Sequence, residues 1–175
     1  NKDINDDVQD LFNVMTGYGV VNHYRKLLVS PHTLRPGITK LIRREIEQHK
    51  KHGNGHIIIK CNQLVDYEMV KVLYEASRAG VKIECIVRGI CSLRPGLPGV
   101  SDTITVRSIV GRLLEHARIY YFHNNGDEEM YFGSADLMTR NLNGRIEVLT
   151  PLLQENLCNN VMNQIVIPQL KDNIH

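Results

Sequence analysis

The sequence predicts an α/β domain in which helices flank a mixed β-sheet. Two observations carry this prediction. Strand and helix patterns alternate between residues 24 and 87, and shorter strand patterns separated by turn residues follow from residue 104 onward. The length of 175 residues suits one domain, and 42% hydrophobic with 23% charged residues is typical of a folded globular chain. This composition excludes a disordered tail, a collagen-like fibre and a low-complexity linker.

The first strand is predicted over residues 24–29, where Ser30-Pro31 ends it. An amphipathic helix is expected next, over residues 38–49, because apolar positions recur there at intervals of three and four residues. Its buried face would consist of Ile38, Leu41, Ile42, Glu45 and Ile46. A charged stretch over residues 48–52 closes this helix, and Gly53 stops it.

A parallel βαβ unit is predicted after this helix. Residues 57–60 form a short, continuous apolar run, which is typical of a strand buried on both faces. Asp66 is a suitable N-cap for a helix over residues 67–79, and Gly80 closes that helix. Residues 81–87 form the next strand, and a connection of this kind should cross over with the right-handed sense.

The pattern changes after Arg88. Residues 89–103 contain three glycines and two prolines, which interrupt regular structure. Short strands are expected over residues 104–107, 117–122, 129–133 and 145–149. The segment 123–127 (HNNGD) predicts a turn between the second and third of these strands.

Two further helices are predicted at the ends of the chain. Thr150-Pro151 is typical of a helix start, and Pro168 follows the end of that helix. Residues 1–23 form a weaker helical region, which we interpret as a segment that joins from a missing upstream domain. Residues 24–175 then form one domain, because no linker divides them. The absence of an initiator Met also indicates a piece of a longer protein.

Charge, cysteine content and hydropathy exclude several classes of protein. The net charge of +2 is too small for a general nucleic-acid binder, so no nucleic-acid partner is predicted. The four cysteines are far apart and form no C-x-x-C pair, which indicates reduced, intracellular thiols and no structural zinc. No apolar run approaches 18 residues and the first residues are no signal peptide, so no transmembrane segment is expected.

The distribution of basic residues points to an anion. From residue 83 to 170 the chain has seven arginines and no lysine, whereas its first 82 residues contain eight lysines and five arginines. The seven are Arg88, Arg94, Arg107, Arg112, Arg118, Arg140 and Arg145. Arginine suits planar, two-pronged contact with phosphate, and lysine offers only a point charge. The alternative is that several of these arginines simply pair with acidic side chains.

The loop that follows Arg88 is a candidate part of this site. Arg88 lies at the carboxyl end of a predicted parallel strand, where open α/β sheets bind their ligands. Backbone N–H groups over residues 89–96 would form an anion-binding nest. The alternative is a surface loop without chemical function.

His116 is the candidate reactive side chain. It lies just before a predicted strand, and Arg118 would project on the same side of that strand. An imidazole beside a cation suits a phosphoryl group, with the ring as nucleophile or proton donor. The small-residue turn 133–136 (GSAD) would add backbone donors near the anion. The alternative is that His116, like most single histidines, is structural.

Together these features resemble the phospholipase D-like fold, whose signature H-x-K-x4-D is followed by a Gly-Ser turn and an Asn. The match is degenerate, because Arg118 replaces the Lys, His123 replaces the Asp and Asp136 replaces the Asn. Hydrolysis of phosphodiesters by a phospholipase D-like enzyme or nuclease, which needs the intact signature, is therefore the alternative function.

A second resemblance covers nearly the whole chain, and it is to the C-terminal part of bacterial polyphosphate kinases. The segments that carry it, in order, are 10–13 (DLFN), 62–66 (NQLVD), 86–96 (IVRGICSLRPG), 106–119 (VRSIVGRLLEHARI), 133–142 (GSADLMTRNL) and 145–149 (RIEVL). The resemblance implies that residues 24–175 are the second of two phospholipase D-like domains. It also implies reversible, Mg²⁺-dependent transfer of the terminal phosphoryl group of ATP to polyphosphate, in a tunnel lined by histidines of both domains.

The resemblance assigns roles to individual residues. His116 would be the catalytic partner of a phosphorylated histidine in the first domain, and Arg88 and Arg145 match arginines that contact nucleotide or phosphate. Further candidates for phosphate binding are Arg118, Ser134 and Arg140. The phosphorylated histidine and the Mg²⁺ contacts lie upstream, so no metal site is assigned to this chain.

The implied partners are ATP or ADP, polyphosphate and the missing N-terminal domains of the same protein. A homo-oligomer is expected, in the cytoplasm or at the membrane periphery. The chain by itself should bind phosphate weakly and catalyse nothing. A third alternative is a non-catalytic module that binds polyanions within a larger assembly.

Overall fold

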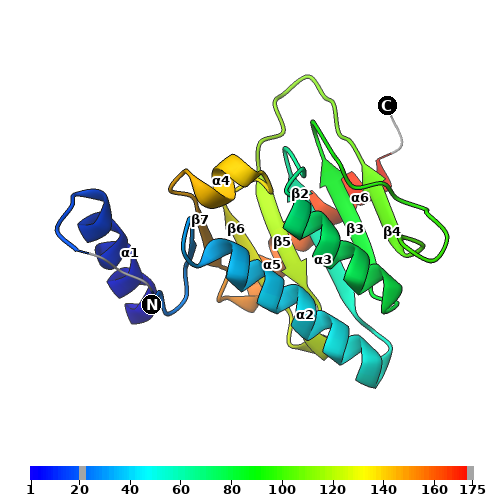
Figure 1. The fold of residues 1–175 in the computed structure, drawn as a ribbon, viewed down its shortest axis with the longest axis horizontal. Helices are drawn as coiled ribbons and strands as arrows, with labels where there is room; N and C mark the ends of the chain where they lie inside the picture. The colour runs from blue at the N-terminus through cyan, green and yellow to red at the C-terminus, as the bar shows by residue number, and fades with distance from the viewer. Residues whose placement is uncertain (20–22, 173–175) are drawn as a thin grey trace.

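The computed structural model describes residues 1–19 and 23–172 of the chain (Figure 1). Over these residues its centre is a seven-stranded sheet in the order β1-β7-β6-β5-β2-β3-β4. The strands are β1 (Leu28–Val29), β2 (His56–Cys61), β3 (Lys82–Val87), β4 (Ile104–Arg107), β5 (Arg118–Phe122), β6 (Glu129–Gly133) and β7 (Val148–Pro151). Strands β2, β3 and β4 are parallel and the other neighbouring pairs are antiparallel. The sheet is therefore mixed, as predicted.

The predicted βαβ unit is confirmed as β2, α3 (Tyr67–Arg78) and β3. Asp66 caps α3, because its carboxylate accepts a hydrogen bond from the N–H of Met69 at 3.2 Å. The preceding helix, α2 (Leu34–His52), is longer than predicted at both ends and includes the charged stretch at its C-terminus. Gly53 ends α2 in the left-handed conformation, with φ of 72°, as the sequence indicates.

Helices cover both faces of the sheet (Figure 1). Helices α2 and α3 pack on one face, over a core that includes Ile57 and Ile59 of β2. On the other face, α5 (Glu155–Val161), the π-helical turn η2 (Met162–Val166) and α6 (Ile167–Lys171) cover a smaller cluster around Ile58. Successive residues of β2 thus enter opposite layers, and the strand is buried on both faces.

Glu45 occupies an apolar position of α2 and is fully buried, as its spacing predicts. Its carboxylate accepts hydrogen bonds from the backbone N–H groups of His56 and Asn124, each at 2.9 Å. Asn124 begins the short helix η1 (Asn124–Gly126), which forms the predicted turn between β5 and β6. The buried carboxylate therefore joins α2 to the start of β2 and to this turn.

The strand predicted over residues 24–29 is wrong in its first four residues, since only β1 pairs with β7. The backbone N–H groups of Arg25, Lys26 and Leu27 instead donate to the carboxylate of Asp7, at 2.7–2.9 Å. Asp7 belongs to α1 (Lys2–Met15), the helix predicted within residues 1–23. Residues 20–22 of that prediction lie outside the described residues.

The last predicted strand and helix are shifted along the chain. β7 begins at residue 148 rather than 145, because the N–H of Glu147 donates to the hydroxyl of Ser30, which in turn donates to the carbonyl of Arg145. Pro151 ends β7 instead of opening a helix. Pro168 lies in the first turn of α6, directly after η2, so the helical segment continues past it.

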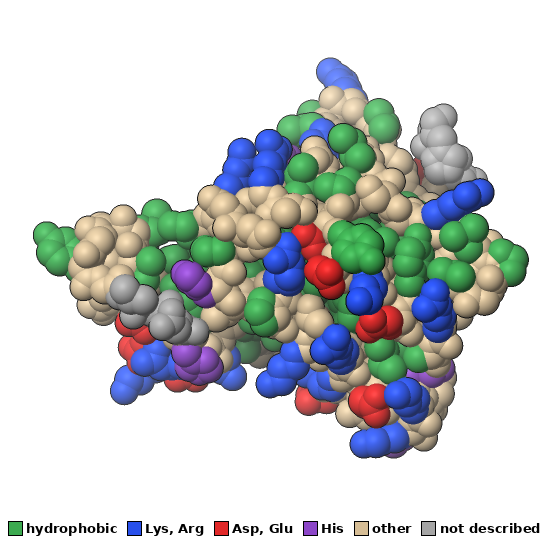
Figure 2. All heavy atoms as spheres, viewed as in Figure 1, with side chains coloured by type: hydrophobic (Ala, Val, Ile, Leu, Met, Phe, Trp, Pro, Cys, Tyr) green, Lys and Arg blue, Asp and Glu red, His purple; other side chains and the backbone are tan. Residues whose placement is uncertain are grey.

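Charge is distributed unevenly over the surface. Figure 2 shows Lys and Arg side chains gathered at the upper edge of this face, beside α4 (Thr139–Asn143), whereas basic and acidic side chains are mixed over α2. Within the described ranges, no helix combines the length and the hydropathy required to span a bilayer.

Candidate functional site

One edge of the sheet brings together five segments that are distant in the sequence. Strands β2 and β3 end at this edge, and β5, which is antiparallel to β2, begins there. Strand β6 ends beside the start of β5, and β7 begins beside the end of β6. The residues that follow or precede these strands therefore meet, at the place where open α/β sheets bind ligands.

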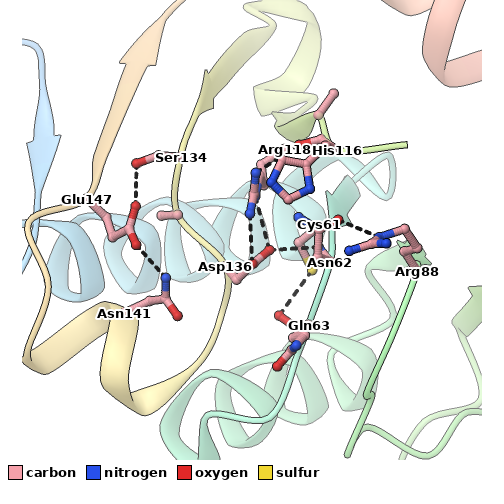
Figure 3. A network of polar contacts seen from close by, with 12 residues as sticks. Cys61, Asn62, Gln63, Arg88, His116, Arg118, Ser134, Asp136, Asn141 and Glu147 are labelled. Carbon is pink, nitrogen blue, oxygen red and sulfur yellow. Dashed lines mark hydrogen bonds and ion pairs between the residues drawn. The ribbon is translucent and has the colours of Figure 1, made fainter. Parts of the chain in front are cut away.

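A pocket of about 420 Å³ lies at this edge, and Figure 3 shows its polar network. It is lined by Asn62, Gln63, Arg88, His116, Arg118, Ser134, Asp136, Arg140, Asn141, Arg145 and Glu147. The lining includes the six residues to which the sequence assigned a role at the site, whereas Arg94, Arg107 and Arg112 are not among its lining residues. Two larger hollows, of about 500 and 650 Å³, lie against α2, and neither has a histidine among its described lining residues. The smaller pocket is therefore the candidate site.

Arg118 and Asp136, two of the three residues that depart from the phospholipase D-like signature, bond to each other. The guanidinium donates from Nε at 3.3 Å and from Nη2 at 3.1 Å to the two carboxylate oxygens. Its Nη1 donates to the carbonyl of His116 at 2.9 Å. Arg118 thus directs three N–H groups at the protein and steadies the backbone of His116.

Asn62 connects this ion pair to Arg88. Its backbone N–H donates to Asp136 at 2.7 Å, and its side-chain Oδ1 accepts from Nε of Arg88 at 2.9 Å. Figure 3 shows Asn62 between Arg88 on one side and Asp136 with Arg118 on the other. Because Nε is engaged, the outer nitrogens of the Arg88 guanidinium are the ones that face a ligand.

Glu147 organises the other side of the pocket. Its carboxylate accepts hydrogen bonds from the hydroxyl of Ser134 and from Nδ2 of Asn141. The backbone N–H of Ser134 donates to the carbonyl of Val148 at 3.0 Å. The hydroxyl and the backbone N–H of Ser134 therefore both bond to the protein. Ser134 does not supply the free backbone donor that the Gly-Ser turn predicts.

The expected anion-binding nest over residues 89–96 is also not formed as predicted. The N–H groups of Gly89 and Ser92 donate to the carbonyls of Asn62 and Leu64, at 2.8 Å each. The N–H of Arg94 donates to the hydroxyl of Tyr74 at 2.9 Å. These bonds fasten the loop to the end of β2 and to α3, so its contribution to the pocket is the side chain of Arg88.

The neighbours of His116 in the chain, Glu115 and Ala117, contact side chains from β2 and α6. Lys60 is 3% exposed, and its ammonium lies 3.4 Å from the carboxylate of Glu115 and 3.4 Å from the carbonyl of Ala117. Gln169 of α6 also donates to Glu115, at 2.9 Å. The imidazole of His116 is exposed, so a fixed backbone presents it at the mouth of the pocket.

The pocket does not fit a magnesium ion by itself. Both of its carboxylates, Asp136 and Glu147, already accept hydrogen bonds from protein groups. In the part of the chain that the structure describes, no group of three or more His, Cys, Asp or Glu residues is arranged to hold a metal. The thiol of Cys61, next to Asn62, is no ligand either, because metals bind the thiolate. Burial raises the pKa of Cys61 well above its ordinary value, so this thiol stays protonated.

The structure adds polar residues that the sequence did not single out as site residues, namely Asn62, Gln63, Asn141 and Glu147. Asn62 directly follows β2, just as Arg88 follows β3. The rule that selected Arg88, namely its position at the carboxyl end of a parallel strand, would have selected Asn62 as well. No comparable pattern in the sequence marks Asn141 or Glu147.

Comparison with known proteins identifies the family to which this chain belongs. The family model described as polyphosphate kinase C-terminal domain 2 matches residues 27–175. The chain belongs to the polyphosphate kinase family. This membership confirms the resemblance stated from the sequence, including its placement in the C-terminal part of such enzymes.

Individual polyphosphate kinases agree with this assignment. The polyphosphate kinase of Prosthecochloris aestuarii is 52% identical over 174 residues, which cover 99% of this chain and 24% of that protein. The crystal structure of polyphosphate kinase from Porphyromonas gingivalis matches 99% of this chain and 26% of its own, with a TM-score of 0.95 and 44% identity. The chain therefore spans about a quarter of the length of these relatives.

A more distant likeness shows the fold alone. The phospholipase D family member Nuc from Salmonella typhimurium matches 83% of this chain and 92% of its own, with a TM-score of 0.60 and 10% identity. The phospholipase D-like fold class predicted from the sequence is thus confirmed. His123, which stands at the Asp position of that signature, lies beyond the far end of β5 and is not among the residues that line the pocket.

Proposed function

We propose that this chain is the second phospholipase D-like domain of a polyphosphate kinase that transfers the terminal phosphoryl group of ATP reversibly to polyphosphate. The observation that carries the proposal is the convergence of His116 with four arginines on one pocket. Two carboxylates also line it, and each is bonded to protein donors, so positive charge predominates toward a ligand. A polyanionic chain and a nucleotide triphosphate are ligands that such a pocket suits.

In this proposal Arg88 and Arg145 bind phosphate oxygens of the nucleotide or of the growing chain. Catalysis of phosphoryl transfer depends mainly on positioning and on stabilising charge that moves onto the phosphate oxygens. The bond from Nε of Arg88 to Asn62 fixes the plane of its guanidinium. Arg140, from α4, contributes further charge, and Arg118 acts mainly through its hold on Asp136 and on the backbone of His116.

His116 acts on the transferred group itself. Its exposed imidazole faces the phosphorylated histidine that the family resemblance places in the upstream domain. There it donates a proton to the leaving oxygen or holds the phosphoryl group during transfer. Ser134 directs its hydroxyl at Glu147, so it shapes the pocket through that carboxylate.

The remaining parts of the enzyme lie outside this chain. The segment 1–23 joins the domain to the upstream domains, which supply the phosphorylated histidine and the Mg²⁺ contacts. We therefore expect the isolated chain to be inactive and the full-length enzyme to be a homo-oligomer. Its substrate ATP places the reaction in the cytoplasm. Phosphodiester hydrolysis is less well supported because the intact signature is absent. Simple polyanion binding is less well supported because it assigns no role to His116.

The proposal is tested by replacing arginines in the full-length enzyme. Arg88→Lys and Arg145→Lys keep the charge but lose the two-pronged contact, so ATP-dependent chain elongation should fall about tenfold or more. The control is Arg78→Lys, an arginine in the last turn of α3 that does not line the pocket. Elongation that is equal in all three variants would remove the pocket from the reaction.

A further inference from the structure

Asn62 is fixed in the pocket from three sides. Its backbone N–H donates to Asp136 at 2.7 Å, and its carbonyl accepts from the N–H of Gly89 at 2.8 Å. Its side-chain Oδ1 accepts from Nε of Arg88 at 2.9 Å. The residue is only 3% exposed, although it lines the pocket. The backbone of Asn62 is thus held on two sides, and the bond to Arg88 orients its side chain.

That orientation determines where the amide nitrogen points. The Nε of an arginine only donates, so the atom that faces it must be the oxygen of the Asn62 amide. Nδ2, with its two N–H groups, is then turned away from Nε of Arg88. It is buried from solvent, and no atom of residues 1–19 or 23–172 accepts a hydrogen bond from it. A buried donor without an acceptor is uncommon in folded proteins and calls for an explanation.

We propose that Nδ2 of Asn62 donates to an oxygen of the phosphoryl group bound in this pocket, while Oδ1 of the same side chain orients Arg88. The proposal rests on the proposed function, because it takes the ligand to be a phosphate of ATP or polyphosphate. A neutral amide is suited to this role, since it donates without adding charge beside the Arg118–Asp136 ion pair. Asn62 is thus both a phosphate-binding residue and the positioning residue for Arg88.

Two substitutions separate these roles in the full-length enzyme. Asn62→Asp retains an oxygen for Arg88 but replaces the amide donor with an anionic oxygen. Asn62→Leu, of similar size, removes both the oxygen and the donor. The matched control is Asn54→Asp, since Asn54 is exposed and bonds only to Asn125 among the described residues. Steady-state elongation with varied ATP and a thermal melt are measured for each.

We expect Asn62→Asp to raise the KM for ATP about tenfold or more, because a charge-assisted hydrogen bond is replaced by repulsion. Its melting temperature should remain close to that of the parent. Asn62→Leu should raise KM and also lower kcat, as Arg88 loses its orientation, and Asn54→Asp should match the parent. If the Asp variant fails to fold, Asn62→Leu decides the matter, and an unchanged KM in it overturns the proposal.

One further variant distinguishes failure of this inference from failure of the proposed function. Parent-like KM and kcat in Asn62→Asp, together with lost elongation in Arg88→Ala, would mean that Asn62 only holds Arg88, and the inference would be overturned. Parent-like kinetics in Arg88→Ala, Asn62→Asp and Asn62→Leu alike would show that the pocket binds no phosphate, and the proposed function would fall with it.

Discussion

Arg118 and Asp136 show how two departures from a signature become one local interaction. Their side chains are 14% and 9% exposed, and the guanidinium bonds both carboxylate oxygens and the carbonyl of His116. A lysine, with its single nitrogen, matches this planar arrangement poorly. The pair therefore replaces the usual Lys and Asn with an interaction that holds the backbone at His116.

Asp7 is a second residue with effects far along the chain. Its side chain is fully buried and accepts hydrogen bonds from three consecutive backbone N–H groups and from the Arg25 guanidinium. Burial alone would raise its pKa, but these four donors outweigh burial, so the pKa of Asp7 lies below its ordinary value. The ionised form thus stabilises the fold.

We predict that Asp7→Asn lowers the free energy of unfolding by about 1–3 kcal/mol at pH 7, since a charged acceptor of several bonds is lost. A lowered pKa contributes stability that is complete above the unfolded-state pKa of about 4 and disappears as the pH falls through the folded-state value. The difference between parent and variant should therefore shrink below about pH 4 in urea denaturation. Asp10→Asn, which removes a more exposed partner of Arg25, should cost little. Equal losses in the two variants would contradict this role.

At the scale of elements, Gly133 allows β6 and β7 to approach closely. It pairs with Leu149, and a Cβ at residue 133 would collide with the backbone carbonyl of Val148 and approach Cα of Leu149 to 3.1 Å. Both atoms belong to the neighbouring strand and cannot move aside as a side chain would. Gly133 also leads directly into Ser134, at the edge of the pocket.

We predict that Gly133→Ala destabilises the domain by roughly 1–3 kcal/mol, because the two strands must separate to admit the methyl group. Gly111→Ala is the control, since a Cβ there has only an ordinary contact at 3.9 Å. Thermal melts of both variants provide the comparison. A parent-like melt of Gly133→Ala would show that the strands accommodate the methyl group without cost.

Local patterns predicted the elements whose interactions are local, and failed where distant residues decide the structure. The parallel unit of β2, α3 and β3 and the position of Arg88 follow from apolar runs, a cap and a strand end. The first strand is shortened by Asp7, which is 18 to 20 residues away in the sequence. The start of β7 is displaced by Ser30, 117 residues from Glu147. No local pattern contains such contacts.

The candidate site was predictable to the same degree. The six candidate residues do line one pocket, because strand ends place them there. Their hydrogen-bond partners were not predictable, and these decide which groups remain available to a ligand. Ser134 and the loop after Arg88 proved to be engaged with the protein, whereas Asn62 holds an unpartnered donor among the described residues.

At the scale of the whole molecule, the sheet order collects the site from segments spread over residues 62–147. Relatives of this chain are about four times as long, so most of their length lies outside the part that this chain matches. At the pocket the domain presents four arginines and the exposed imidazole of His116. In this account His116 takes part in the chemistry, while the packing of the domain does not depend on it.

The most direct test of the central claim is ATP-dependent polyphosphate elongation by the full-length enzyme carrying His116→Ala, measured beside a thermal melt. One positioned acid–base group contributes about 10²–10⁴-fold, so elongation should fall by that factor. The melt should hardly change, because the side chain is exposed. His123→Ala is the matched control, at the other end of β5 and outside the pocket lining, and it should retain elongation. Near-parental elongation by a folded His116→Ala enzyme would contradict the account and make this histidine structural.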